Sequence, residues 1–164
     1  FAKTFSLMKY TRLTKEQFEE LNQEFSNFLA SQQIDKNEWD DIKKNRPEVA
    51  DQELDVFSDL IWEGVLTNAK YLEHYAKNYI FLFECTEVYM STIILRSLEP
   101  NVDFLSKSGL EWLGDHLFTE SVEIQRGNKV FDQDRNQDIF KIIQQGAILS
   151  DGVLYQEIYK LLEK

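Results

Sequence analysis

The stretch YIFLFECTEVYMSTIILR, residues 79–96, limits the folds open to this chain more than any other. No Gly or Pro interrupts residues 65–98, so a long helix has to be weighed against strands. Ten of the seventeen residues 79–95 are β-branched or aromatic, and such residues favour strands. We therefore predict two strands, at about 79–85 and 88–96, joined by a tight turn.

Patterns that begin helices lie on both sides of these strands. Thr14 and Asp35 can each cap a helix, and Gln17 and Glu38 stand three residues later as capping-box partners. Ser108 begins a similar pattern before LEWLGDHL. The predicted helices are residues 15–32, a short helix that ends before Pro47, 47–66, 109–118, 135–145 and 151–163.

Further local signals complete the fold prediction. The run SVEIQRGNKVF is expected to form a hairpin that turns at Gly127 and Asn128, and KYLEHY to add a short strand. Gly146 is a natural end for one helix, and Ser150 a start for the next. The predicted fold class is α+β, with N-terminal helices, antiparallel β-hairpins that form a small sheet, and a C-terminal helix pair.

The chain shows no sign of division into domains. No internal repeat, low-complexity segment or Pro/Gly/Ser linker interrupts it, so we expect a single α+β domain over residues 8–164. A hydrophobic content of 43%, with 12 Phe, 7 Tyr and 3 Trp, predicts an ordered core despite the charge. We interpret residues 1–7, which precede Met8, as an expression remnant or an upstream extension.

Cysteine content and hydropathy bear on the compartment. Cys85 is the only cysteine, so no internal disulfide is available and nothing indicates an oxidising compartment. No apolar run reaches the roughly 20 residues of a membrane helix. The opening FAKTFSLMKY lacks the apolar core and cleavage site of a signal peptide. We expect a cytoplasmic location and no membrane partner.

The net charge of −11 restricts the classes of partner. Residues 1–60, 61–100 and 101–164 each carry more acidic than basic side chains. Because nucleic-acid binding depends on Lys and Arg at the phosphates, no direct nucleic-acid binding is expected. A basic protein partner, or solubility alone, stays open. The sequence does not indicate the oligomeric state.

The sharpest acidic feature lies in DQELDVFSDLIWEG, where Asp51, Asp55, Asp59 and Glu63 recur at four-residue steps along a predicted helix. Like charges at this spacing destabilise a helix by roughly a few tenths of a kcal/mol per pair. Asp51 alone is near the helix start, where the dipole favours a carboxylate. Two interpretations stay open for this acidic stripe: a solvated helix face, or a surface that docks on a basic partner.

Candidates for catalysis or metal binding are few. His74 and His116 each follow an acidic residue, Glu73 and Asp115, but neither HExxH nor ExxH spacing is present. Cys85 has acidic neighbours, which raise the pKa of a thiol, so we interpret it as structural. We therefore predict no catalytic residue, no metal site and no cofactor.

The run DQDRNQD resembles the opening of a calcium-binding loop, with Asp132, Asp134 and Asn136 at alternate positions. The Gly that such a loop needs at position 6 and the Glu at position 12 are replaced by Gln137 and Ile143. We interpret the acidic residues as caps of the following helix.

Aromatic residues alternate along the first predicted strand, where Tyr79, Phe81 and Phe83 share one face. A platform that stacks single-stranded nucleic acid would set such rings among basic residues, and few are near in sequence. We therefore expect this face to pack under helices.

From MKYTRLTKEQF through DLIWEGVLTNAKYLEHY to IFKIIQQGAILSDGVLYQEIY, residues 8–159 resemble a small family of uncharacterised bacterial cytoplasmic proteins, a domain of unknown function. The resemblance covers nearly all of the chain after Met8. It implies a bacterial, soluble, single-domain protein, and it brings no established activity, cofactor or site residue.

Three functional hypotheses follow. The leading one is a non-enzymatic protein-interaction module that docks the acidic stripe on a basic partner. The first alternative is an enzyme with an unrecognised acid–base site around His74 and His116. The second is an acidic mimic of nucleic acid, which needs carboxylates on one continuous exposed face.

Overall fold

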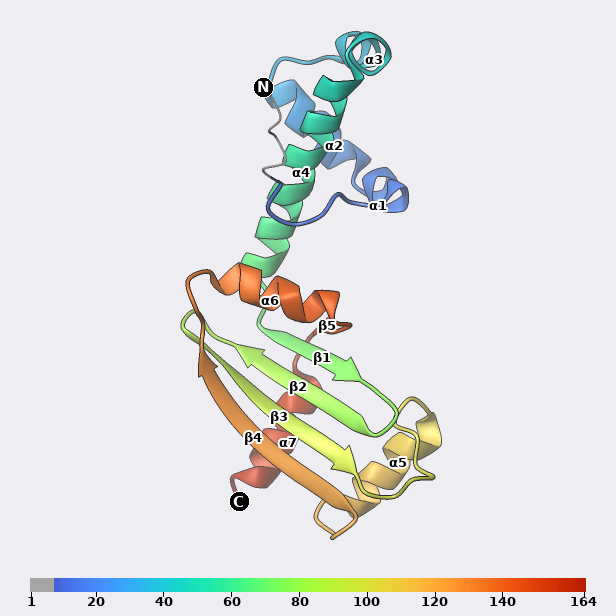
Figure 1. Ribbon diagram of the computed structural model, residues 1–164, viewed down its shortest axis with the longest axis vertical. Coiled ribbons are helices and arrows are strands. Elements are labelled where there is room, and N and C mark those ends of the chain that lie inside the picture. The colour runs from blue at the N-terminus through green and yellow to red at the C-terminus, as the bar shows by residue number, and fades with distance from the viewer. Residues whose placement is uncertain (1–7) are drawn as a thin grey trace. The chain divides into compact units, whose positions relative to one another are not determined.

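The structure, a computed structural model, describes residues 8–164, so the interpretation of residues 1–7 lies outside the described part (Figure 1). The chain forms two compact units, one that ends at Thr67 and one that begins at Asn68. The single domain expected over residues 8–164 stays a prediction. No helix within residues 8–164 has the length and apolar content needed to cross a membrane.

The first unit is helical. The predicted N-caps position two of its helix starts: the Thr14 hydroxyl accepts the Gln17 N–H at 3.2 Å, and the Asp35 carboxylate accepts the Glu38 N–H at 2.8 Å. The Gln17 side chain completes the predicted capping box at Thr14 by accepting the Thr14 N–H at 2.8 Å. The predicted helix over residues 15–32 is interrupted at Leu21. The helices are α1 (Lys15–Glu20), α2 (Asn22–Ser31), α3 (Lys36–Asn45) and α4 (Pro47–Thr67).

Aromatic rings form the centre of the first unit. Phe25 lies edge-on to Phe57 of α4 at 5.0 Å between ring centroids and to Trp39 of α3 at 5.3 Å. Phe18, on the other side of the interruption at Leu21, stacks on the same Phe57 at 5.9 Å. The break therefore lets rings on both α1 and α2 reach α4, a tertiary requirement that the helical pattern alone does not show.

The second unit is a five-stranded antiparallel sheet with three helices, and the predicted α+β fold class is confirmed. The strands predicted over 79–85 and 88–96, and the short strand in KYLEHY, are also confirmed. The strand order is β4-β3-β2-β1-β5. The elements are β1 (Tyr71–Tyr75), β2 (Tyr79–Cys85), β3 (Tyr89–Ser97), α5 (Lys107–His116), β4 (Val122–Val130), α6 (Arg135–Gln144), β5 (Ile148–Ser150) and α7 (Val153–Leu162).

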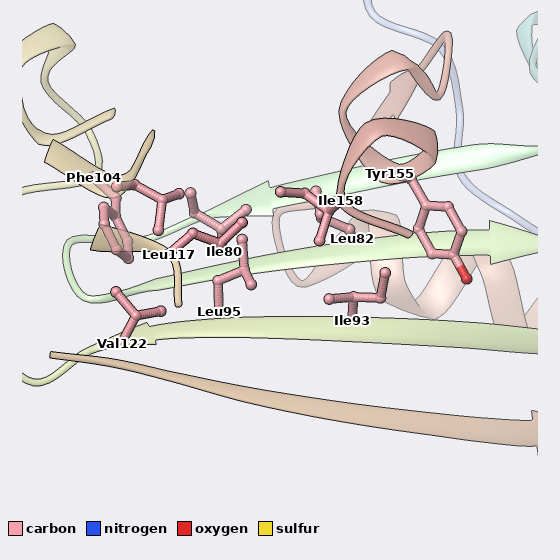
Figure 2. Packing of buried hydrophobic residues seen from close by; sticks show 10 residues of the cluster. Ile80, Leu82, Ile93, Leu95, Phe104, Leu117, Val122, Tyr155 and Ile158 are labelled. Atoms are coloured by element: carbon pink, nitrogen blue, oxygen red, sulfur yellow. The ribbon is translucent and has the colours of Figure 1, made fainter. Parts of the chain in front are cut away.

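One sheet face, the helix-covered face, packs against α5 and α7, which lie behind the sheet in Figure 1. Alternation along β2 directs Ile80 and Leu82 to this face, and the register places Leu95 and Ile93 of β3 beside them. Figure 2 shows these side chains together. The buried cluster comprises Ile80, Leu82, Ile93, Leu95, Phe104, Leu113, Leu117, Val122, Tyr155 and Ile158.

The opposite face, the aromatic face, carries the row Tyr79, Phe81 and Phe83. Their rings stack at centroid distances of 5.8 and 6.3 Å along β2. Phe83 is buried, whereas Tyr79 is 36% exposed. Ile142 of α6 lines a hollow with Met90 of β3, so a helix packs on only part of this face. The expectation that this face packs under helices is therefore met at the Phe83 end and not at Tyr79.

The predicted hairpin over 121–131 is wrong. Gly127 and Asn128 lie inside one continuous strand, β4, which pairs with β3 from Ser97–Val122 to Tyr89–Val130. A Gly-Asn pair favours a two-residue turn only when the two short arms have no better partner. Here nine pairs with a long neighbouring strand outweigh the local turn signal.

Two predicted helix starts are also misplaced. Ser106, not Ser108, caps α5 by accepting the Gly109 N–H at 3.0 Å. Ser150 belongs to β5, and α7 begins after Gly152, which has φ +84°. A Cβ atom on Gly152 would lie 2.3 Å from the Tyr71 ring, so packing against β1 requires a glycine there.

We predict that Leu82→Ala lowers the free energy of unfolding by about 2–5 kcal/mol, because it removes a fully buried side chain from the cluster. The matched control is Leu105→Ala at a side chain that is 65% exposed, where we expect a change within about 0.5 kcal/mol. Urea unfolding followed by circular dichroism measures both. Equal losses in the two variants would contradict this location of the core.

Candidate functional site

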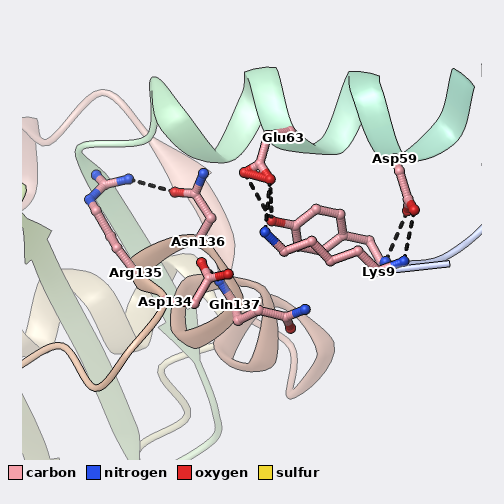
Figure 3. Close-up of polar contacts among 8 residues, drawn as sticks. Lys9, Asp59, Glu63, Asp134, Arg135, Asn136 and Gln137 are labelled. Carbon is pink, nitrogen blue, oxygen red and sulfur yellow. Dashed lines mark hydrogen bonds and ion pairs between the residues drawn. The ribbon is translucent and has the colours of Figure 1, made fainter. Parts of the chain in front are cut away.

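The four residues of the acidic stripe lie on α4, and an extended segment of the same chain binds them. The Asp59 carboxylate accepts the backbone N–H groups of Lys9 at 2.7 Å and Tyr10 at 2.9 Å. Glu63 Oε1 accepts the Lys9 amine at 3.0 Å and the Tyr10 hydroxyl at 3.0 Å. Figure 3 shows these bonds along the helix.

Arg12 continues the same pattern toward the start of α4. Its Nε donates to Asp55 at 2.7 Å, and its Nη1 lies 3.5 Å from an Asp51 oxygen. The next residue, Leu13, donates its N–H to the buried Ser58 hydroxyl at 3.0 Å. We call Lys9, Tyr10, Arg12 and the four stripe residues Asp51, Asp55, Asp59 and Glu63 the N-terminal clamp.

The clamp accounts for the like charges on α4. Each stripe residue has a hydrogen-bond or ion-pair donor from residues 9–12, so the repulsion along the helix is offset by a segment more than 35 positions away. The side chains of Asp55 and Asp51 stay partly exposed, at 34% and 62%. Burial and the Glu63 carboxylate raise the pKa of Tyr10 to about 12.

The structure does not bring the two histidines together. His74, paired with Phe81 across β1 and β2, lies on the aromatic face. His116 belongs to α5, on the helix-covered face, where its Nδ1 lies 2.8 Å from the Trp112 carbonyl oxygen. The sheet therefore separates the two histidines, so they do not form the shared acid–base site of the first alternative.

The other sequence candidates have structural roles. Burial raises the pKa of the Cys85 thiol to about 11, despite an opposing effect from Arg135. Asp134 caps α6 by accepting the Gln137 N–H at 3.2 Å, as the sequence predicts for the calcium-like run (Figure 3). Within residues 8–164, no group of three or more His, Cys, Asp or Glu side chains is arranged to hold a metal ion.

A polar hollow of about 460 Å³ opens on the helix-covered face, between α7 and the strands β2, β3 and β4. The size is in the range of small-ligand sites. We call it the tyrosine cleft. Its lining residues are Glu84, Tyr89, Ser91, Thr92, Arg126, Gly127, Asn128, Tyr155 and Tyr159.

Glu84 enters the cleft because of the alternation of β2. Ile80 and Leu82 face the core, so the next residue on that face is Glu84. Its carboxylate accepts the Tyr71 hydroxyl at 3.1 Å, and that hydroxyl accepts the Gln156 amide at 3.0 Å. Among residues 8–164, no Lys or Arg forms an ion pair with Glu84.

Tyrosine rings of α7 form one wall of the cleft. Tyr155 and Tyr159 stack nearly parallel, with centroids 6.1 Å apart and planes at 12°, and Tyr71 lies 5.8 Å from Tyr155. In Figure 2 the Tyr155 oxygen points away from the apolar cluster. Burial first, and then the Glu84 charge, raise the pKa of Tyr155, so the phenol is neutral at physiological pH.

A cation already lies at the rim of the cleft. The Arg126 guanidinium is 5.3 Å from the centre of the Tyr159 ring, and it donates to Glu163 at 2.7 Å. Asn128, two residues further along β4, donates to the Ser91 hydroxyl at 2.9 Å. Because Arg126 is already paired with Glu163, the Glu84 carboxylate among the tyrosine faces is an environment that attracts a further, organic cation.

Sequence reasoning missed the tyrosine cleft. Its lining residues come from four elements, β2, β3, β4 and α7, and they do not form a recognisable sequence motif. Two weak signals were present. Glu84 interrupts an apolar strand at a position that alternation assigns to the core, and Tyr155 and Tyr159 stand four apart on one helix face. Neither signal specifies a site without the pairing of β2, β3 and β4.

Comparison with known proteins identifies a family. Residues 8–163 match the model described as "Family of unknown function (DUF6495)". The chain belongs to this family. The match confirms the resemblance to an uncharacterised domain of unknown function. Neither the curated proteins nor the solved structures gave a match.

We predict that Asp59→Ala lowers the free energy of unfolding by about 1–2 kcal/mol, because two backbone N–H groups lose their acceptor. Asp51→Ala is the matched control on the same helix, and its 3.5 Å ion pair should contribute less than about 0.5 kcal/mol. Amide hydrogen exchange should show lost protection at Lys9 and Tyr10 in the first variant alone. Unchanged protection in Asp59→Ala would contradict the clamp.

The Tyr10 phenol provides a pH test. Its folded pKa of about 12 lies above the ordinary value of 10, so the stabilisation is complete below pH 10 and is lost as the pH rises toward 12. Glu63→Gln should lower this pKa but leave it above 10, because burial is the larger cause. A carbon-13 titration of the Tyr10 ring measures the shift, with Glu53→Gln as the control. An unchanged Tyr10 pKa in Glu63→Gln would contradict the contact.

Proposed function

We propose that this chain is a non-enzymatic binding module of the bacterial cytoplasm that recognises a basic protein partner. In this proposal a Lys or Arg side chain of the partner enters the tyrosine cleft. The observation that carries it is the position of Glu84, whose carboxylate lies among tyrosine rings and hydrogen-bonds to the Tyr71 hydroxyl.

The chemistry of the cleft favours a cation over a neutral or acidic ligand. A guanidinium or ammonium group within about 6 Å of an aromatic ring gains roughly 0.5–2 kcal/mol, depending on desolvation. A charge-assisted bond to a carboxylate adds to this and fixes the position of the group. The net charge of −11 also steers a basic partner toward the chain over longer distances.

The acidic stripe is the second candidate surface for the same class of partner. The N-terminal clamp supports it, because Asp55, Asp59 and Glu63 bind an extended basic segment in this structure. A partner segment would have to replace residues 9–12 or share the stripe with them. For this reason the proposal gives the primary role to the tyrosine cleft. Because residues 9–12 already bind the acidic stripe, its carboxylates are less available to mimic the phosphates of a nucleic acid.

The proposal predicts that an acetylated, amidated GGRGG peptide binds the full-length chain and shifts the NMR signals of Ser91, Tyr155 and Tyr159. The same peptide with citrulline in place of arginine keeps the shape of the side chain but lacks the charge, so it should bind at least about tenfold more weakly. Glu84→Gln should weaken binding of the arginine peptide by a similar factor, because glutamine can still accept the Tyr71 hydroxyl but carries no charge.

Glu87→Gln, at an exposed position in the turn after β2, is the matched control and should leave the affinity unchanged. Asp55→Asn tests the second surface. Equal binding of the arginine and citrulline peptides, or equal effects of Glu84→Gln and Glu87→Gln, would overturn the role of the cleft. Loss of binding in Asp55→Asn alone would transfer the proposed function to the stripe.

A further inference from the structure

β4 forms one edge of the sheet and has a partner strand on one side only, β3. Within residues 8–164 no strand pairs with its outer side, although the C-terminal end of α7 extends past β4 in the view of Figure 1. Its last six residues, 125–130, are exposed, and it contains no proline. Proteins usually shorten, cover or interrupt such edges, because the outward N–H and C=O groups can pair with another chain. A strand edge of nine residues, of which the last six are exposed, is therefore a candidate for pairing with another chain.

The sequence of β4 is complementary to itself. If two copies align antiparallel about a two-fold axis at Arg126, all nine residues find a partner. Glu123 then lies opposite Lys129 of the second copy, and Val122 opposite Val130. Because the axis is perpendicular to the sheet, each pair stays on one face. The interface thus contains two Glu–Lys pairs and two Val–Val pairs, which are the cross-strand combinations that stabilise antiparallel strands.

Neighbouring registers lack this complementarity. A shift of two residues in either direction pairs only seven residues and sets no Glu opposite a Lys or Arg. A shift of one residue would turn one sheet over relative to the other. The apolar side chains of the two copies would then lie on opposite faces of the joined sheet. The alignment about Arg126 is therefore selected both by strand length and by charge.

Charges already present in the chain extend these pairs. Arg96 of β3 lies 3.2 Å from Glu123, and Asp132 lies 3.8 Å from Lys129. Across the interface the order of charges becomes Arg96, Glu123, Lys129 and Asp132, with alternating signs. At the axis Arg126 meets its own copy, but each guanidinium is already neutralised by Glu163 at 2.7 Å.

We propose that β4 pairs with β4 of a second copy of this chain, in the antiparallel register centred on Arg126. The two five-stranded sheets then form one continuous sheet, and the β4 edge of each copy is covered. The seam shares Arg126, Gly127 and Asn128 with the lining of the tyrosine cleft, but Glu123 and Lys129 lie outside that lining, so changes at these two residues test the dimer without altering the cleft.

A charge exchange in the full-length chain tests the proposal. Sedimentation equilibrium should show a dimer for the unaltered chain. Glu123→Lys and Lys129→Glu each place like charges opposite one another twice, so each should weaken the dimer at least about tenfold. The double variant restores opposite charges across the interface, although it loses the pairs with Arg96 and Asp132 within each chain, so it should dimerise at least about tenfold more tightly than either single variant.

Glu120→Lys is the control, since it makes the same change of net charge as Glu123→Lys just before the strand begins. It should leave the dimer unchanged, and circular dichroism confirms that every variant is folded. A chain that stays monomeric at about 1 mM would overturn the proposal. So would a dimer that neither single variant weakens, or a double variant that dimerises no more tightly than either single variant.

Discussion

Burial of one face of the sheet beneath α5 and α7 is the interaction on which the second unit depends. Leu82 and Leu95 are fully buried there, and burying a side chain of this size contributes about 2–3 kcal/mol. Because side chains alternate along a strand, this burial fixes which residues of β2 face the helices. Glu84 reaches the tyrosine cleft for that reason, and a slip of one residue would move it to the aromatic face.

The cleft begins where the apolar packing ends. Tyr155 takes part in both, since its ring packs with the buried cluster while its hydroxyl lies near Glu84. The core therefore holds one wall of the cleft rigid before any ligand arrives, and a rigid site loses less entropy on binding. In the first unit the acidic stripe follows a different principle, because a segment distant in sequence supplies its donors.

Local patterns predicted most of the elements, and tertiary pairing decided the rest. The β-branched and aromatic content of residues 79–96 was sufficient for β2 and β3, since both strands lie at the centre of the sheet. The Gly127–Asn128 signal failed because pairing with β3 outweighs a short turn preference. Ser150 failed as a cap because pairing with Tyr71 in β1 places it in a strand.

The candidate sites were less accessible to sequence reasoning than the fold. The acidic stripe was visible as a periodic pattern, but the segment that binds it was not, because hydrogen bonds from Lys9 and Tyr10 to Asp59 span about fifty positions. The tyrosine cleft requires the register of three strands and the position of α7 together. Such sites become evident only when long-range pairing is known, whereas propensity and capping are local.

Binding of a cation in the tyrosine cleft can be observed through nuclear Overhauser contacts between the cation and the tyrosine rings. A peptide containing trimethyl-lysine, added to the labelled full-length chain, supplies nine equivalent methyl protons as the probe. The account predicts contacts from these protons to the ring protons of Tyr155 and Tyr159, and none to Tyr79 or Phe81 on the aromatic face. Contacts confined to the aromatic face would contradict it.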